Sequence, residues 1–130
     1  MIPDITLFYA SLCAILLVIL SVIVIRTRFA EQVGIGTGES RILTKAVRVQ
    51  ANFTEYVPLA LLLMALAEMH NAPETMIHAL GILLVISRLS HAYGLRKSAG
   101  PGVFRGGGAV GTMLVLLVAA GWGIYSFLAI

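Results

Sequence analysis

Four long apolar stretches, separated by short polar segments, make up almost the whole chain. The first carries no charge from Ile5 to Ile25, and as a helix rising about 1.5 Å per residue it can cross a bilayer core of roughly 30 Å. Ser40 precedes the second stretch and suits the N-cap position of a helix. The pattern predicts four helices, over residues 5–25, 41–69, 74–96 and 105–129.

The segments between these stretches are rich in residues that end helices. Residues 31–40, EQVGIGTGES, form a glycine-rich loop without periodicity, and SAGPG at residues 98–102 must break the helical pattern. Gly107 and Gly111 in the fourth stretch are spaced for close contact with a neighbouring helix. We therefore expect a single domain, residues 1–130, folded as an all-α integral membrane bundle of four transmembrane helices.

The composition supports a membrane protein. Of the 130 residues, 59% are hydrophobic and 12% are charged, whereas a soluble domain carries about 25% charged residues. The net charge of +3 is too small to indicate a nucleic-acid partner, so none is expected. The single cysteine, Cys13, lies inside an apolar stretch and cannot form an intramolecular disulfide.

The charges that flank the apolar stretches predict the topology. The first and third connections are rich in arginine and lysine, whereas the second carries Glu68 and Glu74 and neither basic type. Basic connections stay in the cytoplasm, so the first and third connections are expected there and both termini outside. We expect a multi-pass protein of a bacterial inner membrane.

A polar stripe opens the second predicted helix. Arg48, Asn52 and Glu55 are spaced i, i+4 and i+7, so on a helix they lie on one face. If Arg48 lies at the water interface, Glu55 lies roughly 10 Å deeper, at about 1.5 Å per residue. A charge at depth costs on the order of 3 kcal/mol on insertion scales, so it normally has a partner and a use.

Other polar residues belong to the same end of the predicted bundle. The end of the third helix and the start of the fourth share the cytoplasmic side with the polar stripe of the second. This topology can bring together Arg48, Asn52, Glu55, Arg88, His91, Tyr93 and Arg105. Arginine binds carboxylates through two hydrogen bonds, a carboxylate can take an ammonium group, and an amide can take a peptide-like group. The set suits a small zwitterion with more negative than positive charge.

The second and third stretches resemble the MAPEG family, the membrane-associated proteins of eicosanoid and glutathione metabolism. The second-helix pattern R-x-Q-x-N-x-x-E-Y-x-P is carried by Arg48, Gln50, Asn52, Glu55, Tyr56 and Pro58. The third-helix pattern R-x-x-H-x-x-G is carried by Arg88, His91 and Gly94. The chain departs from the family at positions 91 and 95, where members tend to carry tyrosines.

The resemblance implies a homotrimer that binds glutathione, as co-substrate, between neighbouring protomers. The binding residues that we expect are Arg48, Gln50, Asn52, Glu55, Tyr56, Arg88, His91 and Tyr93. Arg105 resembles the catalytic arginine that stabilises the thiolate, with Arg96 as the alternative. The thiolate would conjugate a lipophilic electrophile that arrives from the lipid bilayer, or reduce a lipid hydroperoxide.

Three other interpretations remain open from the residues. A small four-helix transporter carries an acidic residue deep in a span, but Glu55 lies towards one end with Arg48 and Asn52, which favours a site open to the cytoplasm. A non-catalytic membrane scaffold could keep the same helices, and the polar residues could form a purely structural cluster. The three histidines show no spacing typical of metal ligands, so no metal is expected.

Overall fold

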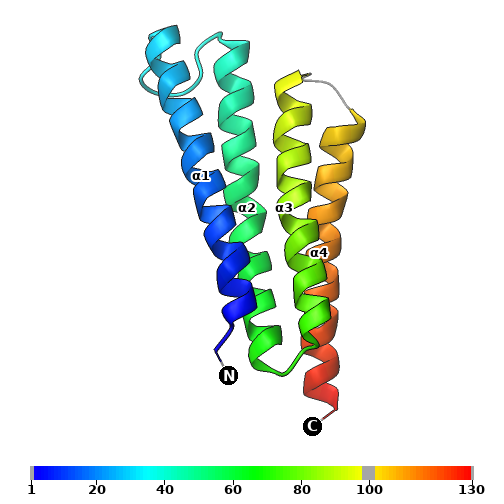
Figure 1. Cartoon of the computed structure of the whole chain (residues 1–130). Coiled ribbons are helices and arrows are strands. Elements are labelled where there is room, and N and C mark those ends of the chain that lie inside the picture. The colour runs from blue at the N-terminus through cyan, green and yellow to red at the C-terminus, as the bar shows by residue number, and fades with distance from the viewer. Residues whose placement is uncertain (1, 98–101, 130) are drawn as a thin grey trace.

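The computed structural model describes residues 2–97 and 102–129, apart from the side chains of residues 95 and 96. It contains four helices, α1 (Asp4–Glu31), α2 (Arg41–Met69), α3 (Glu74–Lys97) and α4 (Val103–Leu128). Each includes a span long and apolar enough to cross a membrane. Figure 1 shows the α1–α2 loop, the end of α3 and the start of α4 at one end of the bundle, with the α2–α3 turn and the two ends of the described chain at the other. The start of α2, the end of α3 and the start of α4 therefore share one end of the bundle, as predicted.

The two central helices of the bundle are α2 and α3. Each of these two contacts all three other helices, whereas α1 and α4 do not meet within the described residues. The core lies between them and includes Phe53, Val57 and Met64 from α2. Many large apolar side chains remain exposed on the outer faces. An outer surface of this kind suits contact with lipid rather than with water.

The helix α1 is longer than the sequence pattern predicts. The predicted end at residue 25 is wrong, because the helix continues to Glu31 and stops where Gln32 adopts a left-handed conformation with φ 56°. Arg28 donates hydrogen bonds to carbonyl oxygens of the following loop, the shortest being 2.8 Å to Gly36. Arg28 thus folds the loop back onto its own helix. The structure confirms Ser40 as the N-cap of α2, since its hydroxyl accepts a 3.1 Å bond from the N–H of Leu43.

Gly108 and Gly111 of α4 make the close contact with α3, whereas the predicted pair was Gly107 and Gly111. A Cβ atom on Gly108 would lie 2.5 Å from the carbonyl oxygen of Ser87, and one on Gly111 would overlap the Ser87 hydroxyl. A Cβ on Gly107 would meet nothing within 4 Å. The prediction for Gly111 is confirmed and the prediction for Gly107 is wrong. The helix presents residue 108 to α3 instead, three residues from 111 on the same face. The predicted helix break falls largely on residues 98–101, which lie outside the described residues.

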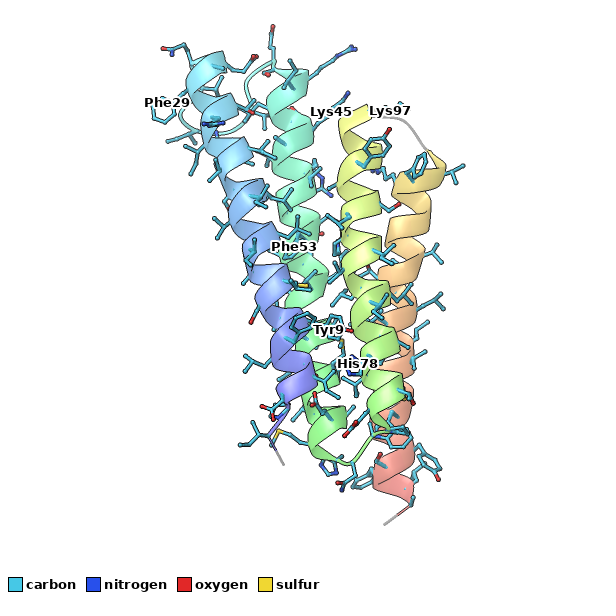
Figure 2. All side chains as sticks on the ribbon, in the orientation of Figure 1. Tyr9, Phe29, Lys45, Phe53, His78 and Lys97 are labelled. Atoms are coloured by element: carbon cyan, nitrogen blue, oxygen red, sulfur yellow. The ribbon has the colours of Figure 1, made fainter. Side chains whose placement is uncertain are left out.

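The end that carries the termini has its own polar contact between α1 and α3. The Tyr9 hydroxyl lies 3.1 Å from Nδ1 of His78, and the two rings meet edge to face. Figure 2 shows both side chains between these helices. Gly81 lets the Tyr9 ring lie directly against α3, because a Cβ at that position would overlap the ring. This contact joins the N-terminal part of α1 to α3, at the end of the bundle opposite the first loop and the polar stripe of α2.

Candidate functional site

A buried hydrogen-bond network joins α2, α3 and α4. Its centre is Arg88 of α3, whose side chain is only 2% exposed. Nη2 of Arg88 donates a 2.7 Å hydrogen bond to Oδ1 of Asn52, and Nη1 donates a 3.2 Å bond to Oγ1 of Thr112. Thr112 in turn donates a 3.0 Å bond to the carbonyl oxygen of Gly108. Two predicted site residues, Asn52 and Arg88, therefore meet directly.

The positive charge of Arg88 has no carboxylate beside it in the described part of the chain. Both hydrogen-bond partners are neutral side chains, and Nε has no hydrogen-bond partner. The guanidinium carbon lies 6.0 Å from the centre of the Phe53 ring, within the range of a cation–π interaction. An uncompensated charge inside a membrane bundle is costly. A negative group of a ligand near the network would offset that cost.

His91 lies next to the network on α3. Its side chain is 4% exposed and packs against Gly108, where an added Cβ would lie 2.6 Å from the His91 backbone nitrogen. Nδ1 of His91 is buried without a hydrogen-bond partner in the described structure. Arg88 precedes His91 by three residues on α3, so the two share a face of that helix. Arg48 of α2 and Arg105 of α4 belong to the same half of the bundle, so three helices contribute guanidinium groups to this region.

The polar stripe of α2 lies at the edge of the buried network. Arg48 and Glu55 are exposed, whereas Asn52 and Tyr56 are partly buried. The stripe therefore has a buried side, where Asn52 meets Arg88, and an outer side, where the two charged residues are open. A ligand on the outer side could contact the stripe without displacing any helix.

Two of the predicted binding residues lie elsewhere. Gln50 donates a 2.7 Å hydrogen bond from Nε2 to the Ser21 hydroxyl, so it faces α1. Tyr93 is 52% exposed, meets Phe104 edge to face, and has the Lys97 ammonium 5.6 Å from its ring centre. Neither residue reaches the Arg88 network. Their assignment to the binding site stays a prediction for this single chain.

Tyr93 instead lines a groove of about 510 Å³ between α1, α2 and α3. Most of its lining is aliphatic, with Thr27 and Lys45 as further polar groups. Figure 2 labels Lys45 near the end of the bundle that carries the first loop. Asn52 and Arg88 do not line this groove. The apolar groove and the polar network are thus separate features of the same half of the protein.

Arg105 lies in the first turn of α4, which begins two residues earlier than predicted, at Val103. Its side chain is partly buried. Its backbone rests on α3 at Gly94, where an added Cβ would lie 2.5 Å from the Arg105 nitrogen. The absence of a side chain at Gly94 therefore allows the start of α4 to lie directly beside the end of α3. This contact places Arg105 at the same end of the bundle as Arg48.

The sequence analysis missed Thr112 as a partner of Arg88. A signal was present, because Thr112 follows Gly108 by one helical turn in an otherwise apolar stretch. Gly108 and Gly111, which pack against α3, lie on the same face of α4 as Thr112. Among the described residues, no group of three or more His, Cys, Asp or Glu side chains is placed to hold a metal ion.

Four helices that are each long and apolar enough to cross a membrane are typical of a polytopic, all-helical membrane protein. The chain belongs to the MAPEG family, whose sequence model matches residues 6–125. It is also similar to the "Inner membrane protein YecN" of Escherichia coli strain K12, with 42% identity over 86 residues. The protein of the same name from Escherichia coli O6:H1 strain CFT073 gives the same identity. The chain spans 66% of the length of these curated relatives, and the match covers 66% of this chain.

Proposed function

We propose that the protein is a glutathione-dependent membrane enzyme. The observation that carries the proposal is the uncompensated charge of Arg88, buried next to a polar stripe that presents Arg48 and Glu55. Glutathione has two carboxylates and one ammonium group, so its net charge is opposite to that of this region. Membership of a family that includes glutathione transferases and peroxidases supports the same choice.

The stripe offers complementary groups at spacings of one helical turn. Arg48 can hold a carboxylate through two hydrogen bonds, and Glu55 can hold the ammonium group. Asn52 lies between them on the same face of α2. A short peptide laid along the stripe would satisfy each of these groups without entering the core.

The proposed assembly is a homotrimer with the site between protomers. Arg48 and Glu55 are exposed on a helix that spans the membrane, and charged groups facing lipid are costly. A neighbouring protomer that covers the stripe would remove this cost and form the second wall of the site. A closed symmetric ring satisfies every copy of the stripe in the same way.

The proposed chemistry begins with the glutathione thiol. A free thiol has a pKa of about 8.5, so only a few per cent is thiolate at neutral pH. Lowering that pKa to about 6.5 requires roughly 2.7 kcal/mol of preference for the anion. The Arg105 guanidinium is the group proposed to supply it. The thiolate then attacks a lipophilic electrophile or reduces a lipid hydroperoxide. The apolar groove beside Tyr93 is the proposed place for that second substrate.

The proposed location is the inner membrane of a bacterium, as the name of the Escherichia coli relatives says of those proteins. The stripe would face the cytoplasm, and both termini would lie outside. Cytoplasmic glutathione would then have direct access to the site.

Calorimetric titration of the detergent-purified protein with glutathione tests the proposal. We expect saturable binding, and a higher unfolding temperature with glutathione than without it. Glu55→Gln should weaken binding by about 1–3 kcal/mol, because the ammonium loses its charged partner. Glu39→Gln, the same change in the exposed first loop, is the matched control and should bind normally. Absence of both binding and heat protection in the wild-type protein would reject glutathione as the ligand.

A further inference from the structure

The Asn52 side-chain amide is anchored at one end only. Its oxygen accepts the 2.7 Å hydrogen bond from Arg88, while no hydrogen bond in the described part of the chain involves its Nδ2 group. The side chain is partly buried, between the core and the exposed charges of the α2 stripe. The two N–H groups of Nδ2 therefore lie open on the side of the amide away from the oxygen that Arg88 holds.

Arg88 determines which end of the amide faces inward. A guanidinium group has five donors and no acceptor, so it can face only the oxygen of an amide. A flipped Asn52 would set donors against donors and leave one more buried N–H without a partner. The orientation of Asn52, which is often ambiguous for this residue type, is therefore fixed by chemistry.

The rest of the network holds Arg88 itself in place. Thr112 occupies its Nη1 group and bonds onward to the Gly108 carbonyl, while the Phe53 ring lies beneath the guanidinium. At 2% exposure, Arg88 has almost no surface with which to touch a ligand on the outer side of the stripe. Its hydrogen bonding can therefore reach a ligand there only through Asn52.

We propose that Arg88 is a positioning residue that makes Asn52 a dedicated hydrogen-bond donor, selecting a carboxylate or carbonyl oxygen of the ligand at this point. The hydrogen bond to a cation also polarises the amide and strengthens its N–H groups as donors. The inference rests on the proposed function for the identity of the ligand as glutathione. It adds which ligand atom faces Asn52 and why Arg88 is needed to select it.

The polarity of the whole stripe follows from this assignment. Arg48, one turn before Asn52, offers only donors, and Glu55, one turn after it, offers only acceptors when ionised. Along α2 the stripe thus presents two hydrogen-bond donors followed by one acceptor. This order matches a ligand whose anionic oxygens face Arg48 and Asn52 and whose ammonium faces Glu55. A ligand group with only N–H donors would leave Asn52 unpaired and is disfavoured at this position.

The Asn52→Asp variant tests the oxygen and the N–H₂ group of the amide separately. The aspartate keeps an oxygen for Arg88 and adds an ion pair, so the unfolding temperature should stay the same or rise. It removes both N–H donors and adds negative charge next to the ligand oxygen, so glutathione affinity should fall at least about tenfold. Asn52→Leu removes both ends and should lower stability and affinity together. Asn52→Asp binding glutathione with wild-type affinity would overturn the inference.

Substitution of Arg88 tests its action through Asn52. Arg88→Lys keeps a charged donor for the Asn52 oxygen, so we expect affinity to fall only about threefold. Arg88→Met frees the amide to rotate, so we expect a loss of at least about tenfold. Better binding by Arg88→Met than by Arg88→Lys would contradict a positioning role. If Arg88→Met does not fold, the Asn52→Asp comparison still decides the question.

Nitrogen-15 labelling restricted to asparagine observes the amide directly, because Asn52 and Asn71 are the two asparagines of the chain. Glutathione should shift the Asn52 side-chain N–H₂ signals and leave those of Asn71, in the turn at the opposite end, unchanged. Glutathione binding measured by calorimetry without this shift would overturn the inference and leave the proposed function standing.

A carboxylate probe keeps the inference testable if glutathione does not bind at all. In that case the proposed function fails, and sodium acetate replaces glutathione in the same titration. A shift of the Asn52 N–H₂ signals that exceeds that of Asn71 would support Asn52 as an open donor for anionic oxygen. Equal responses of the two asparagines to acetate would overturn it.

Discussion

The Glu68 carboxylate accepts a 2.8 Å hydrogen bond from the backbone N–H of Thr6, 62 residues earlier in the chain. Its other oxygen accepts a 2.9 Å bond from the N–H of Ile5. The first turn of α1 has no side-chain cap from its own N-cap residue, Pro3. Glu68, near the end of α2, therefore caps α1 from a different helix and places a negative charge at its positive end.

Glu68→Gln should lower stability by about 1–2 kcal/mol, because one acceptor oxygen and the favourable charge at the helix end are lost. Glu68→Leu should cost more, about 2–4 kcal/mol, since two backbone N–H groups lose their acceptors. Glu31→Gln, at the exposed opposite end of the same helix, is the control and should be nearly silent. Unfolding in detergent measures the stability, and hydrogen exchange at residues 5 and 6 should speed up only in the Glu68 variants.

Gly108→Ala should destabilise the bundle by about 1–3 kcal/mol, because the added methyl group would overlap backbone atoms of Ser87 and His91. Gly107→Ala is the matched control in the next position. Nothing lies within 4 Å of its Cβ site, so the better helix propensity of alanine should leave stability unchanged or raise it by up to about 1 kcal/mol. Thermal unfolding of both variants gives the comparison, and equal destabilisation would argue against the α3–α4 contact.

The sequence pattern predicted what depends on spacing within one helix. The four spans, the Ser40 cap and the one-sided stripe of Arg48, Asn52 and Glu55 follow from periodicity alone. The contacts between helices depend on how each helix is rotated about its axis, which spacing does not fix. This is why the sequence analysis named Gly107 in place of Gly108 and left Glu68 as an ordinary loop charge.

The same distinction, between spacing within a helix and rotation of the helix, applies to the candidate site. Asn52 and Arg88 were predicted to converge and do meet, but the sequence could not show that Arg88 lies behind Asn52 rather than beside it. Gln50 shares a helix with Asn52, yet two residues turn it through about 200° on an α-helix, towards Ser21 of α1. Residues that belong to one sequence pattern can thus face different neighbours.

Single cysteines should report the predicted topology. Glu39→Cys in the first loop and Glu74→Cys at the start of α3 are both exposed and lie at opposite ends of the bundle. A membrane-impermeant thiol reagent added to intact cells should label the Glu74→Cys variant, and the Glu39→Cys variant should react only after lysis. The native Cys13 is buried and provides a low background. Labelling of both variants in intact cells would reject the orientation.

Native mass spectrometry in mild detergent should release three copies of the chain together. The physical reason is the exposure of Arg48 and Glu55 on a membrane-spanning helix, which a second protomer would cover. Double replacement by apolar residues, Arg48→Leu with Glu55→Leu, should remove the need for cover and shift the population towards smaller species. Arg41→Leu with Glu39→Leu, two exposed charges near the start of α2, is the control. A wild-type monomer that retains full glutathione affinity would rule out a site shared between protomers.

The catalytic part of the proposal depends on Arg105. If its guanidinium stabilises the glutathione thiolate, Arg105→Ala should lose most of the conjugating activity, and Arg105→Lys should lose part of it, because the lysine charge is more compact and placed differently. The pH profile is the sharper readout. A stabilised thiolate keeps the thiol pKa below its free value of about 8.5, so the wild-type rate should reach its plateau at lower pH than the rate of Arg105→Ala. Raising the pH should therefore recover much of the activity of Arg105→Ala.

An arginine that only anchors α4 would behave differently. Any cation would serve, so Arg105→Lys would be silent, and Arg105→Ala would lower the unfolding temperature without moving the pH profile. Arg41→Ala, which removes an exposed arginine from the start of α2, controls for the loss of one positive charge at the same end. If the bound thiol ionises at the same pH with and without Arg105, another cation stabilises the thiolate. Arg96 and Arg28 would then be the next residues to replace, because both belong to the end of the bundle that carries the first loop.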